Sequence, residues 1–317
     1  MAQTAEEQRR GLALRGEALP AIDPISGLPL PTLHDVLLAR QGVARYLTPT
    51  PLLRPAALAE RLGCDVYVKC ENLQPIGAFK VRGGLNLLSH LSPEQRARGV
   101  IAASTGNHGQ SIAYAAREFG CEARIYLPER ANPLKVASME RLGARVVYAG
   151  VDFDEALGVA ERDAAASGAH FIHSANEPLL IAGVATCALE ILEAVPDLDV
   201  LIVPGGGGSG LAGACLVGKG INSALRVIGV QAEGAPAMWE TWRAGAFVTT
   251  ERVDTYAEGL ATRVAWSLPM QILWRRLDDF LLVGDAEMRR ATLTLLETTR
   301  QLAEGAGAAA AAAAWRL

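Results

Sequence analysis

The chain has 317 residues, half of them hydrophobic and a fifth charged, with a net charge of −4. This composition supports a large buried core and excludes a disordered chain. The absence of a basic run argues against nucleic-acid binding, and no apolar run reaches membrane-spanning length. The N-terminus lacks the apolar segment of a signal peptide. Five scattered cysteines, with no Cys-x-x-Cys pair, argue against a disulfide framework or a zinc site. We therefore expect a cytoplasmic protein whose partners include neither nucleic acid nor membrane.

The first hundred residues mix extended and helical segments. Residues 1 to about 30 are rich in Ala, Gly and Pro, and we expect them to be loose. Ser92, Pro93 and Gln95 are typical of a helix start, with Ser92 as the N-cap. The other elements predicted here are a helix at 32–41, an extended stretch at 47–53, a helix at 56–62, a strand at 65–69 and a helix from Lys80 to about Leu91.

From residue 100 onward, apolar strands and periodic helices alternate. This rhythm predicts an α/β fold with parallel strands, and the glycine-rich turns favour two open sheets with helices on both faces over a barrel. The predicted strands are 100–104, 123–127, 145–148, 169–173, 200–203 and 226–231, and the predicted helices are 107–119, 133–142, 153–167, 181–194 and one after the glycine run at 205–208.

The tail departs from this rhythm. We predict a long helix from Asp285 to Ala303, with Asp285 as its N-cap. Seven alanines, Ala308 to Ala314, follow Gly305 and Gly307, and we expect no strand after them.

The stretch Lys69 to Gly83, KCENLQPIGAFKVRG, places Lys80 at a strand-to-helix turn. In open α/β sheets, ligand-binding and catalytic residues often lie at such turns. Beside Gly77, Ala78 and Phe79, the amine can be desolvated, and a desolvated amine loses its charge and becomes a nucleophile. An ordinary surface lysine in a first helical turn fits the spacing equally well.

Two glycine-bearing turns favour the first interpretation. The segment STGNHGQ, Ser104 to Gln110, follows a strand and opens a helix, so its hydroxyls, amide and free N–H groups suit a carboxylate. The segment PGGGGSGLAG, Pro204 to Gly213, resembles a phosphate-binding nest but lacks the Lys-Ser/Thr of a P-loop. An ordinary glycine-bearing N-cap remains an alternative for the first turn. A nucleophilic lysine, a phosphate nest and a carboxylate site together suggest pyridoxal phosphate and an amino-acid substrate.

These three segments, in this order, resemble the threonine/serine dehydratase group of pyridoxal-phosphate enzymes, in the fold-type II, tryptophan synthase β-like class. The resemblance covers about residues 48–307 and implies a cofactor in the cleft between two domains, a large one formed by residues 1–98 and 178–317 and a small one formed by 99–177. It implies that Lys80 forms the Schiff base, that Phe79 packs on the cofactor ring and that Asn107 bonds its 3′-oxygen. The other implied site residues are Gly205, Gly206, Gly207 and Gly208 for the phosphate, Glu304 near the cofactor, and Ser104, Thr105, Gly106, Asn107 and His108 for the substrate carboxylate.

The resemblance implies β-elimination from a β-hydroxy amino acid such as threonine or serine, giving a 2-oxo acid and ammonia, in a homodimer or homotetramer. Hydroxyaspartate, phenylserine and a hydroxyectoine-derived amino acid are alternative substrates. A serine racemase is a second alternative, although Thr105 stands where racemases place serine. A non-catalytic phosphate- or amino-acid-binding protein is a third.

Two departures from the family pattern concern its other sites. The family's last strand, which carries a serine set against the pyridine nitrogen, has no match in this chain. Some members bind a divalent ion; Glu233 matches a first ligand, but Trp239 stands where an aspartate is expected. We therefore interpret Glu233 as structural or as a partial cation site.

Overall fold

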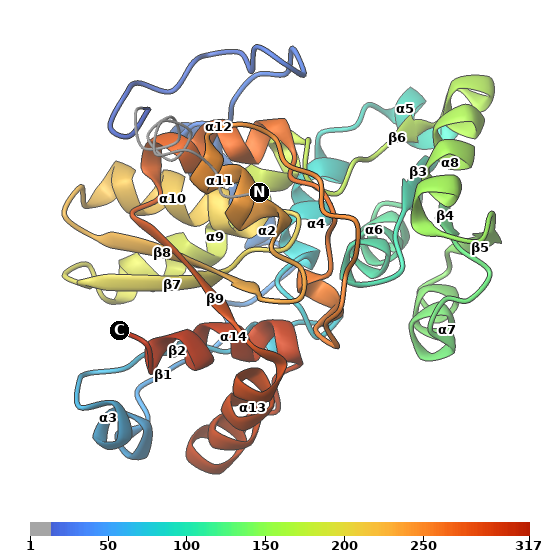
Figure 1. Ribbon diagram of the computed structural model, residues 1–317. Helices are drawn as coiled ribbons and strands as arrows, with labels where there is room; N and C mark the ends of the chain where they lie inside the picture. The colour runs from blue at the N-terminus through green and yellow to red at the C-terminus, as the bar shows by residue number, and fades with distance from the viewer. Residues whose placement is uncertain (1–13) are drawn as a thin grey trace.

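Two parallel β-sheets form the frame of the computed structural model, which describes residues 14–317 (Figure 1). The four-stranded sheet has the order β5-β4-β3-β6, with β3 at Val100–Ala103, β4 at Ala123–Leu127, β5 at Arg145–Tyr148 and β6 at His170–Phe171. The three-stranded sheet has the order β7-β8-β9, with β7 at Val200–Pro204, β8 at Arg226–Ala232 and β9 at Asp279–Val283. Every pairing within these two sheets is parallel, which confirms the predicted α/β class with two open sheets.

Helices cover both faces of the four-stranded sheet. On one face, α6 (Asn107–Glu118) and α7 (Pro133–Arg141) share an apolar cluster with Ile125 of β4. On the other face, α8 (Phe153–Ser167) packs against Ile101 and Tyr126 through its alanines. Successive strand residues point to opposite faces, so a strand that is apolar at every position requires a helix on each side.

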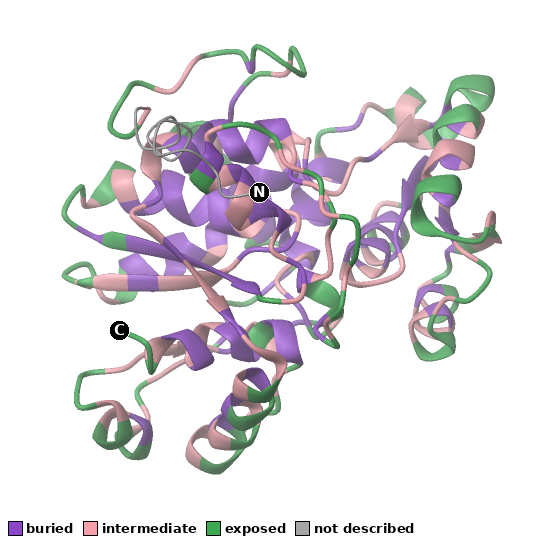
Figure 2. Cartoon of the chain, viewed as in Figure 1, coloured by how far each residue is buried: buried purple, intermediate pink, exposed green. Residues whose placement is uncertain are grey.

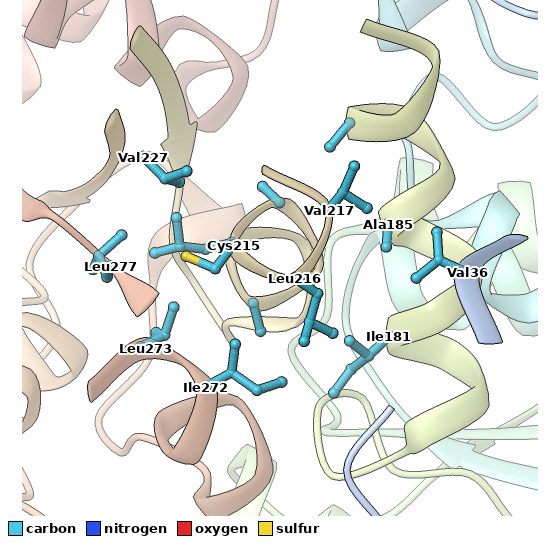
Figure 3. Packing of buried hydrophobic residues seen from close by; sticks show 14 of the residues in the cluster. Val36, Ile181, Ala185, Cys215, Leu216, Val217, Val227, Ile272, Leu273 and Leu277 are labelled. Carbon is cyan, nitrogen blue, oxygen red and sulfur yellow. The ribbon is translucent and has the colours of Figure 1, made fainter. Parts of the chain in front are cut away.

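The three-stranded sheet is covered in the same way. One face carries α9 (Pro178–Ala194), α10 (Ser209–Ile221) and α12 (Ser267–Arg276). Figure 3 shows α10 between the other two: Leu216 and Val217 face Ile181 and Ala185 of α9, and Cys215 faces Leu273 of α12. The opposite face carries α13 (Asp285–Thr299) and α14 (Gly305–Ala314). Figure 2 shows the buried residues concentrated on the helices around this sheet.

The remaining elements connect these layers. They are α2 (Leu33–Val43), β1 (Leu52–Leu53), α3 (Ala56–Leu62), β2 (Val68–Lys69), the 3-10 turn η1 (Glu71–Leu73), α4 (Val81–Ser89), α5 (Pro93–Arg98), α11 (Ala237–Ala244) and the 3-10 turn η2 (Glu258–Leu260). Strands β1 and β2 form a separate antiparallel pair. The capping box predicted for α5 is confirmed, because Ser92 and Gln95 each accept a hydrogen bond from the other's backbone N–H.

Several predicted boundaries were wrong. Neither α12 nor β9 was predicted; Pro269 suggests a break, but in a first helical turn proline removes no hydrogen bond. Helix α13 ends at Thr299 rather than Ala303, and its N-cap is Gly284 rather than Asp285.

The expectation of a loose N-terminus is wrong for the part of the lead-in that the structure describes. Leu30 is buried, the buried Asp23 accepts bonds from the backbone of Ile25 and Ser26, and Gly16 donates to the carbonyl of Arg275. Residues 1–13 lie outside the described chain.

Candidate active site

Lys80 is the N-cap residue of α4 and lies half-buried between the two sheets. Its Nζ donates to Ser209 Oγ at 2.8 Å and to the Ser174 carbonyl at 3.2 Å. Within residues 14–317 it contacts no carboxylate. Because burial disfavours the ammonium and no anion compensates for it, the pKa of Lys80 falls to about 8. About a tenth of the amine is therefore uncharged at pH 7, far more than for an ordinary lysine.

The anion loop, Ser104 to Gly109, joins β3 to α6. Its Ser104 hydroxyl accepts a bond from the Gly106 N–H at 3.1 Å, and Gly106 caps α6 without a side-chain bond. Within the described chain the N–H groups of Thr105, Asn107 and His108 donate to no protein acceptor. Free N–H groups at the positive end of a twelve-residue helix are suited to bind a carboxylate.

His108 takes a different position from the rest of the anion loop. Its imidazole is buried, and Nε2 lies 3.3 Å from the Ile172 carbonyl, to which it must donate. Nδ1 is buried and has no partner in the described chain. Burial, together with the nearby charge of Lys80, lowers its pKa to about 3. The ring is therefore neutral and offers an unused acceptor, not a cation.

The glycine loop, Gly205 to Gly208, joins β7 to α10. Gly205 continues the sheet, since its N–H donates to the Val230 carbonyl at 2.8 Å. The N–H groups of Gly206, Gly207 and Gly208 have no protein acceptor in residues 14–317, and Gly208 has a φ of +92°, which favours glycine. A Cβ on Gly206 would lie 2.0 Å from the Gly259 carbonyl oxygen, so no side chain fits there.

A cavity of about 1170 Å³ connects these groups. Its lining includes Lys80, Phe79, Ser104 to His108 of the anion loop, Gly206 to Gly208 and Glu304. Phe79 lies against the backbone of Gly210, where a Cβ would meet its ring at 2.9 Å. Of the residues predicted to bind the cofactor or the substrate, only Gly205 does not line this cavity.

Three polar contacts cross the mouth of the cavity, from the segment 99–177 to the rest of the chain. Asn107 Nδ2 donates to Glu304 Oε1 at 2.8 Å. Lys135 of α7 pairs with Glu258 of η2, and Asp154 of α8 pairs with Arg263. Lys135, Ser174 and Ser209 were not predicted as site residues, whereas the sequence AEGLA had placed Glu258 in a loop near the active site. Of these residues, Ser209 could have been predicted from the sequence, because it opens the helix directly after the glycine loop.

Glu233 lies away from the cavity lining, at the end of β8 and close to the C-terminal residues. Its carboxylate accepts from Arg316 Nη2 at 3.1 Å, and the same guanidinium pairs with Glu287. Trp239 Nε1 donates to the Phe280 carbonyl at 2.9 Å, and the side chain packs against the hydrophobic core. In the described chain, Glu233 belongs to an ion pair rather than to a cluster of metal-binding side chains.

The geometry fits a phosphorylated aldehyde cofactor. A helix N-terminus with free N–H groups suits the phosphate, the space above Gly206 is kept open by the lack of a Cβ, and Lys80 supplies an amine of lowered pKa. Residues 43–317 match the family model described as pyridoxal-phosphate dependent enzyme. The chain belongs to this family of pyridoxal-phosphate-dependent enzymes, which confirms the predicted cofactor.

Individual relatives agree with this assignment. The chain is 40% identical over 282 residues to the L-threonine ammonia-lyase of Thermotoga maritima, covering 89% of this chain and 70% of the relative. It is similar to the processed threonine deaminase isoform 2 of Solanum lycopersicum, with 32% identity and a TM-score of 0.85 over 89% of this chain and 82% of that one. It is also similar to maize serine racemase, with 30% identity and a TM-score of 0.87 over 90% of this chain and 86% of that one. Among residues 14–317, no helix is long and apolar enough to cross a membrane.

Proposed function

We propose that this chain removes water from a β-hydroxy amino acid, such as L-threonine or L-serine, and releases a 2-oxo acid and ammonia. The observation that carries the proposal is the free amine of Lys80, held without an anionic partner between two loops with unused N–H groups. The relatives named threonine ammonia-lyase and threonine deaminase support this reaction over others in the family.

The glycine loop would hold the phosphate, and Lys80 would hold the aldehyde carbon of the cofactor. Gly206, Gly207 and Gly208 offer backbone donors that are fixed before the ligand arrives and therefore need little reorganisation. Phe79, lying against Gly210, would form a wall for the pyridine ring. When bound, pyridoxal phosphate supplies an electron sink for the charge left at the substrate α-carbon.

The anion loop would orient the substrate through its α-carboxylate. The N–H groups of Thr105, Asn107 and His108 and the hydroxyl of Ser104 are the available donors, whereas the neutral His108 ring offers no charge. With the substrate bound, Lys80 Nζ would take the α-proton. Ser209 and Ser174 accept from this nitrogen and hold it in place.

Bond changes in the substrate then balance with water as the only other reactant, since one water is released and one is consumed. The Cα–H bond breaks and its proton passes to Lys80; the Cβ–O bond breaks and the hydroxyl leaves as water after gaining one proton, which balances the proton taken by Lys80. The enamine that remains hydrolyses to the 2-oxo acid and ammonia. The enzyme needs no oxidant, since the β-carbon is reduced as the α-carbon is oxidised.

We further propose a two-domain layout, with residues 99–177 as the small domain and residues 1–98 and 178–317 as the large one, and a cytoplasmic homodimer or homotetramer. The four-stranded sheet lies wholly within 99–177, and all five cysteines are free. Small-angle scattering with light scattering would measure the assembly; a monomer at micromolar concentration would contradict the oligomer.

The test of function uses the full chain saturated with pyridoxal phosphate. We expect visible imine absorption that borohydride removes, and 2-oxo acid release from serine, threonine or another member of a β-hydroxy amino acid panel that includes hydroxyaspartate and phenylserine. Lys80→Ala should lower this release by about a thousandfold or more, because it removes both the attachment point and the base. A colourless chain under saturation would instead favour a binding protein, and D-serine formation would favour a racemase.

A further inference from the structure

A buried group of four charges lies beneath the turn that carries Lys80. Arg82 is at its centre, with a side chain that is 0% exposed. The Arg82 network consists of Arg82, Glu71, Glu190 and Lys69, with the hydroxyls of Thr50 and Thr186. None of these residues belongs to the proposed catalytic groups.

Arg82 uses all of its donors within the network. Nε and Nη2 donate to the two oxygens of Glu71 at 2.7 and 2.8 Å, and Nη1 and Nη2 donate to the two oxygens of Glu190 at 2.8 Å each. Nη1 also donates to Thr186 Oγ1 at 3.2 Å. Two bidentate forks define the orientation of a planar guanidinium, which a lysine ammonium cannot reproduce.

Lys69 completes the charge balance. Its Nζ donates to Glu190 Oε2 at 2.7 Å and to the Thr50 carbonyl at 2.8 Å. Burial opposes the charge on Glu190, but its bonds to Arg82 and Lys69 outweigh this effect and lower its pKa. Burial likewise opposes the charge on Arg82, whose pKa is nevertheless raised by its bonds to the two carboxylates. Arg82 and Glu190 are therefore both held in their charged forms.

The Arg82 network joins the chain before Lys80, at Glu71, to the chain after it, at Arg82. Glu71 in η1 and Arg82 in α4 are eleven positions apart, and the turn between them contains Gly77, where φ is +69°. Arg82 then fixes the first turn of α4 to α9 through Thr186 and Glu190. The two backbones approach so closely that a Cβ on Gly183 would lie 2.6 Å from the Arg82 carbonyl oxygen.

Stability alone is a weak reason for such a network. Desolvating four charges costs several kcal/mol for each ion, and apolar residues of similar volume often stabilise a protein equally well. What a two-fork guanidinium provides is one fixed geometry. We propose that Arg82 is a positioning residue for the proposed reaction, holding the turn from Glu71 to Arg82 so that the Lys80 amine stays between Ser209 and Ser174.

The surroundings of Lys80 make this positioning measurable. The neighbouring titratable groups His108 and His173 are neutral, and burial and the charge of Lys80 lower their pKa values to about 3 and about 4. The pKa of Lys80 is therefore set chiefly by how well the turn keeps water away from it. A looser turn would admit water and raise the pKa of Lys80 toward its ordinary value.

The experiment compares Arg82→Lys and Glu71→Gln in the full chain. Lys80 is acetylated at a series of pH values without added cofactor, and the modified peptide is quantified by mass spectrometry. We expect the apparent pKa of Lys80 to rise by about one unit in Arg82→Lys, which leaves about tenfold less free amine at neutral pH. In the cofactor-loaded enzyme, kcat should fall by about tenfold, whereas KM should change by less than about threefold.

Asp278→Asn is the matched control. Asp278 is, like Glu71, a half-buried carboxylate paired with a basic side chain, here Lys219. It lies by the first residues of β8 and β9 and touches no part of the Lys80 turn. The Asp278→Asn variant should lower the melting temperature by about as much as Glu71→Gln does, and it should leave the pKa of Lys80 unchanged.

An unchanged Lys80 pKa in cooperatively folded Arg82→Lys would overturn the proposal, as would an equal shift in Asp278→Asn. Where Arg82→Lys does not fold, Glu71→Gln, which keeps Arg82 and the side-chain volume, decides by the same criteria. The proposal rests on the proposed function, yet the acetylation needs no turnover. Failure of the function itself would appear separately, as the absence of 2-oxo acid release from the unsubstituted chain.

Discussion

The anion loop and the glycine loop both follow a parallel strand and open a helix, but they are built differently. The anion loop carries hydroxyls, an amide and an imidazole. A Cβ on its Gly106 would have nothing closer than the Lys135 amine at 3.7 Å, and of its two glycines only Gly109, at the helix end, is closely packed, against Met139 at 2.9 Å. The glycine loop has no side chains at all, and Cβ atoms on Gly206 and Gly208 would approach neighbouring atoms to 2.0 and 2.8 Å.

This difference indicates two ways of binding an anion. The glycine loop presents only backbone donors, and it is held by close packing against Gly259 and Pro269. Its geometry should therefore be rigid and intolerant of substitution. The anion loop depends on side chains that can be exchanged, so single changes there should tune binding rather than destroy it.

The comparison is tested most severely at Gly206. Gly206→Ala places a methyl group against the Gly259 carbonyl, and we expect a loss of about 3 kcal/mol in the free energy of unfolding, since overpacking against backbone leaves little room to adjust. Affinity for pyridoxal phosphate should fall by roughly tenfold or more. Denaturant unfolding and cofactor titration measure the two effects.

Gly207→Ala is the control for that change, because its Cβ would meet only Ala175 Cβ at an ordinary 3.7 Å. It should fold with nearly unchanged stability. Equal behaviour of the two variants would show that close packing does not define the glycine loop.

A second effect comes from the buried imidazoles beside Lys80. In the folded chain the pKa values of His108 and His173 are lowered to about 3 and about 4, so the unfolded chain takes up protons first as the pH falls. Stability is therefore complete above pH 6.5 and lost progressively below it, by about 2 kcal/mol per imidazole between pH 7 and pH 5. Denaturant unfolding across this range measures the slope.

His108→Gln should flatten that slope, because a neutral amide can still donate to the Ile172 carbonyl. His34→Gln, an exposed position on α2, should leave the slope unchanged. A slope that persists in His108→Gln and its His173→Gln partner would argue that neither imidazole is buried and neutral.

A smaller change is expected at the contact between the anion loop and α14. Asn107→Ala removes the donor to Glu304 and should cost about 1 kcal/mol, seen as a roughly fivefold rise in KM. Glu304→Gln keeps an acceptor oxygen for Asn107 and should change KM by less than about twofold. A larger effect of Glu304→Gln would give the carboxylate charge a role that the hydrogen bond does not explain.

The smallest effect belongs to Thr105. Thr105→Ser keeps the hydroxyl and removes one methyl group, so 2-oxo acid release should stay within about twofold. Chiral chromatography of the serine that remains would show whether D-serine forms. Its appearance in Thr105→Ser alone would mean that the methyl group restrains racemisation.

Much of the fold could be read from the chain because it depends on local patterns. Strands β4 and β5 and helices α3 and α8 have the bounds that the sequence predicts. Each is a segment of regular hydrophobic pattern that ends at turn residues. Strand β9 was missed because only Leu277 and Asp278 separate it from α12, with no glycine or proline between them. It becomes a strand only by pairing with β8.

The sequence by itself determined the family, the cofactor and the candidate residues around Lys80, because the two glycine-bearing turns and the lysine turn are local motifs. Only the tertiary structure decided what each residue touches. It buried the His108 ring, used the Gly205 N–H in the sheet and brought Ser209 to Lys80 from a distance of 129 positions. It also enclosed Arg82 between Glu71 and Glu190, which sequence distance alone does not predict. The physical reason is that burial, and with it the lowered pKa of Lys80, arises from the packing of segments far apart in the chain.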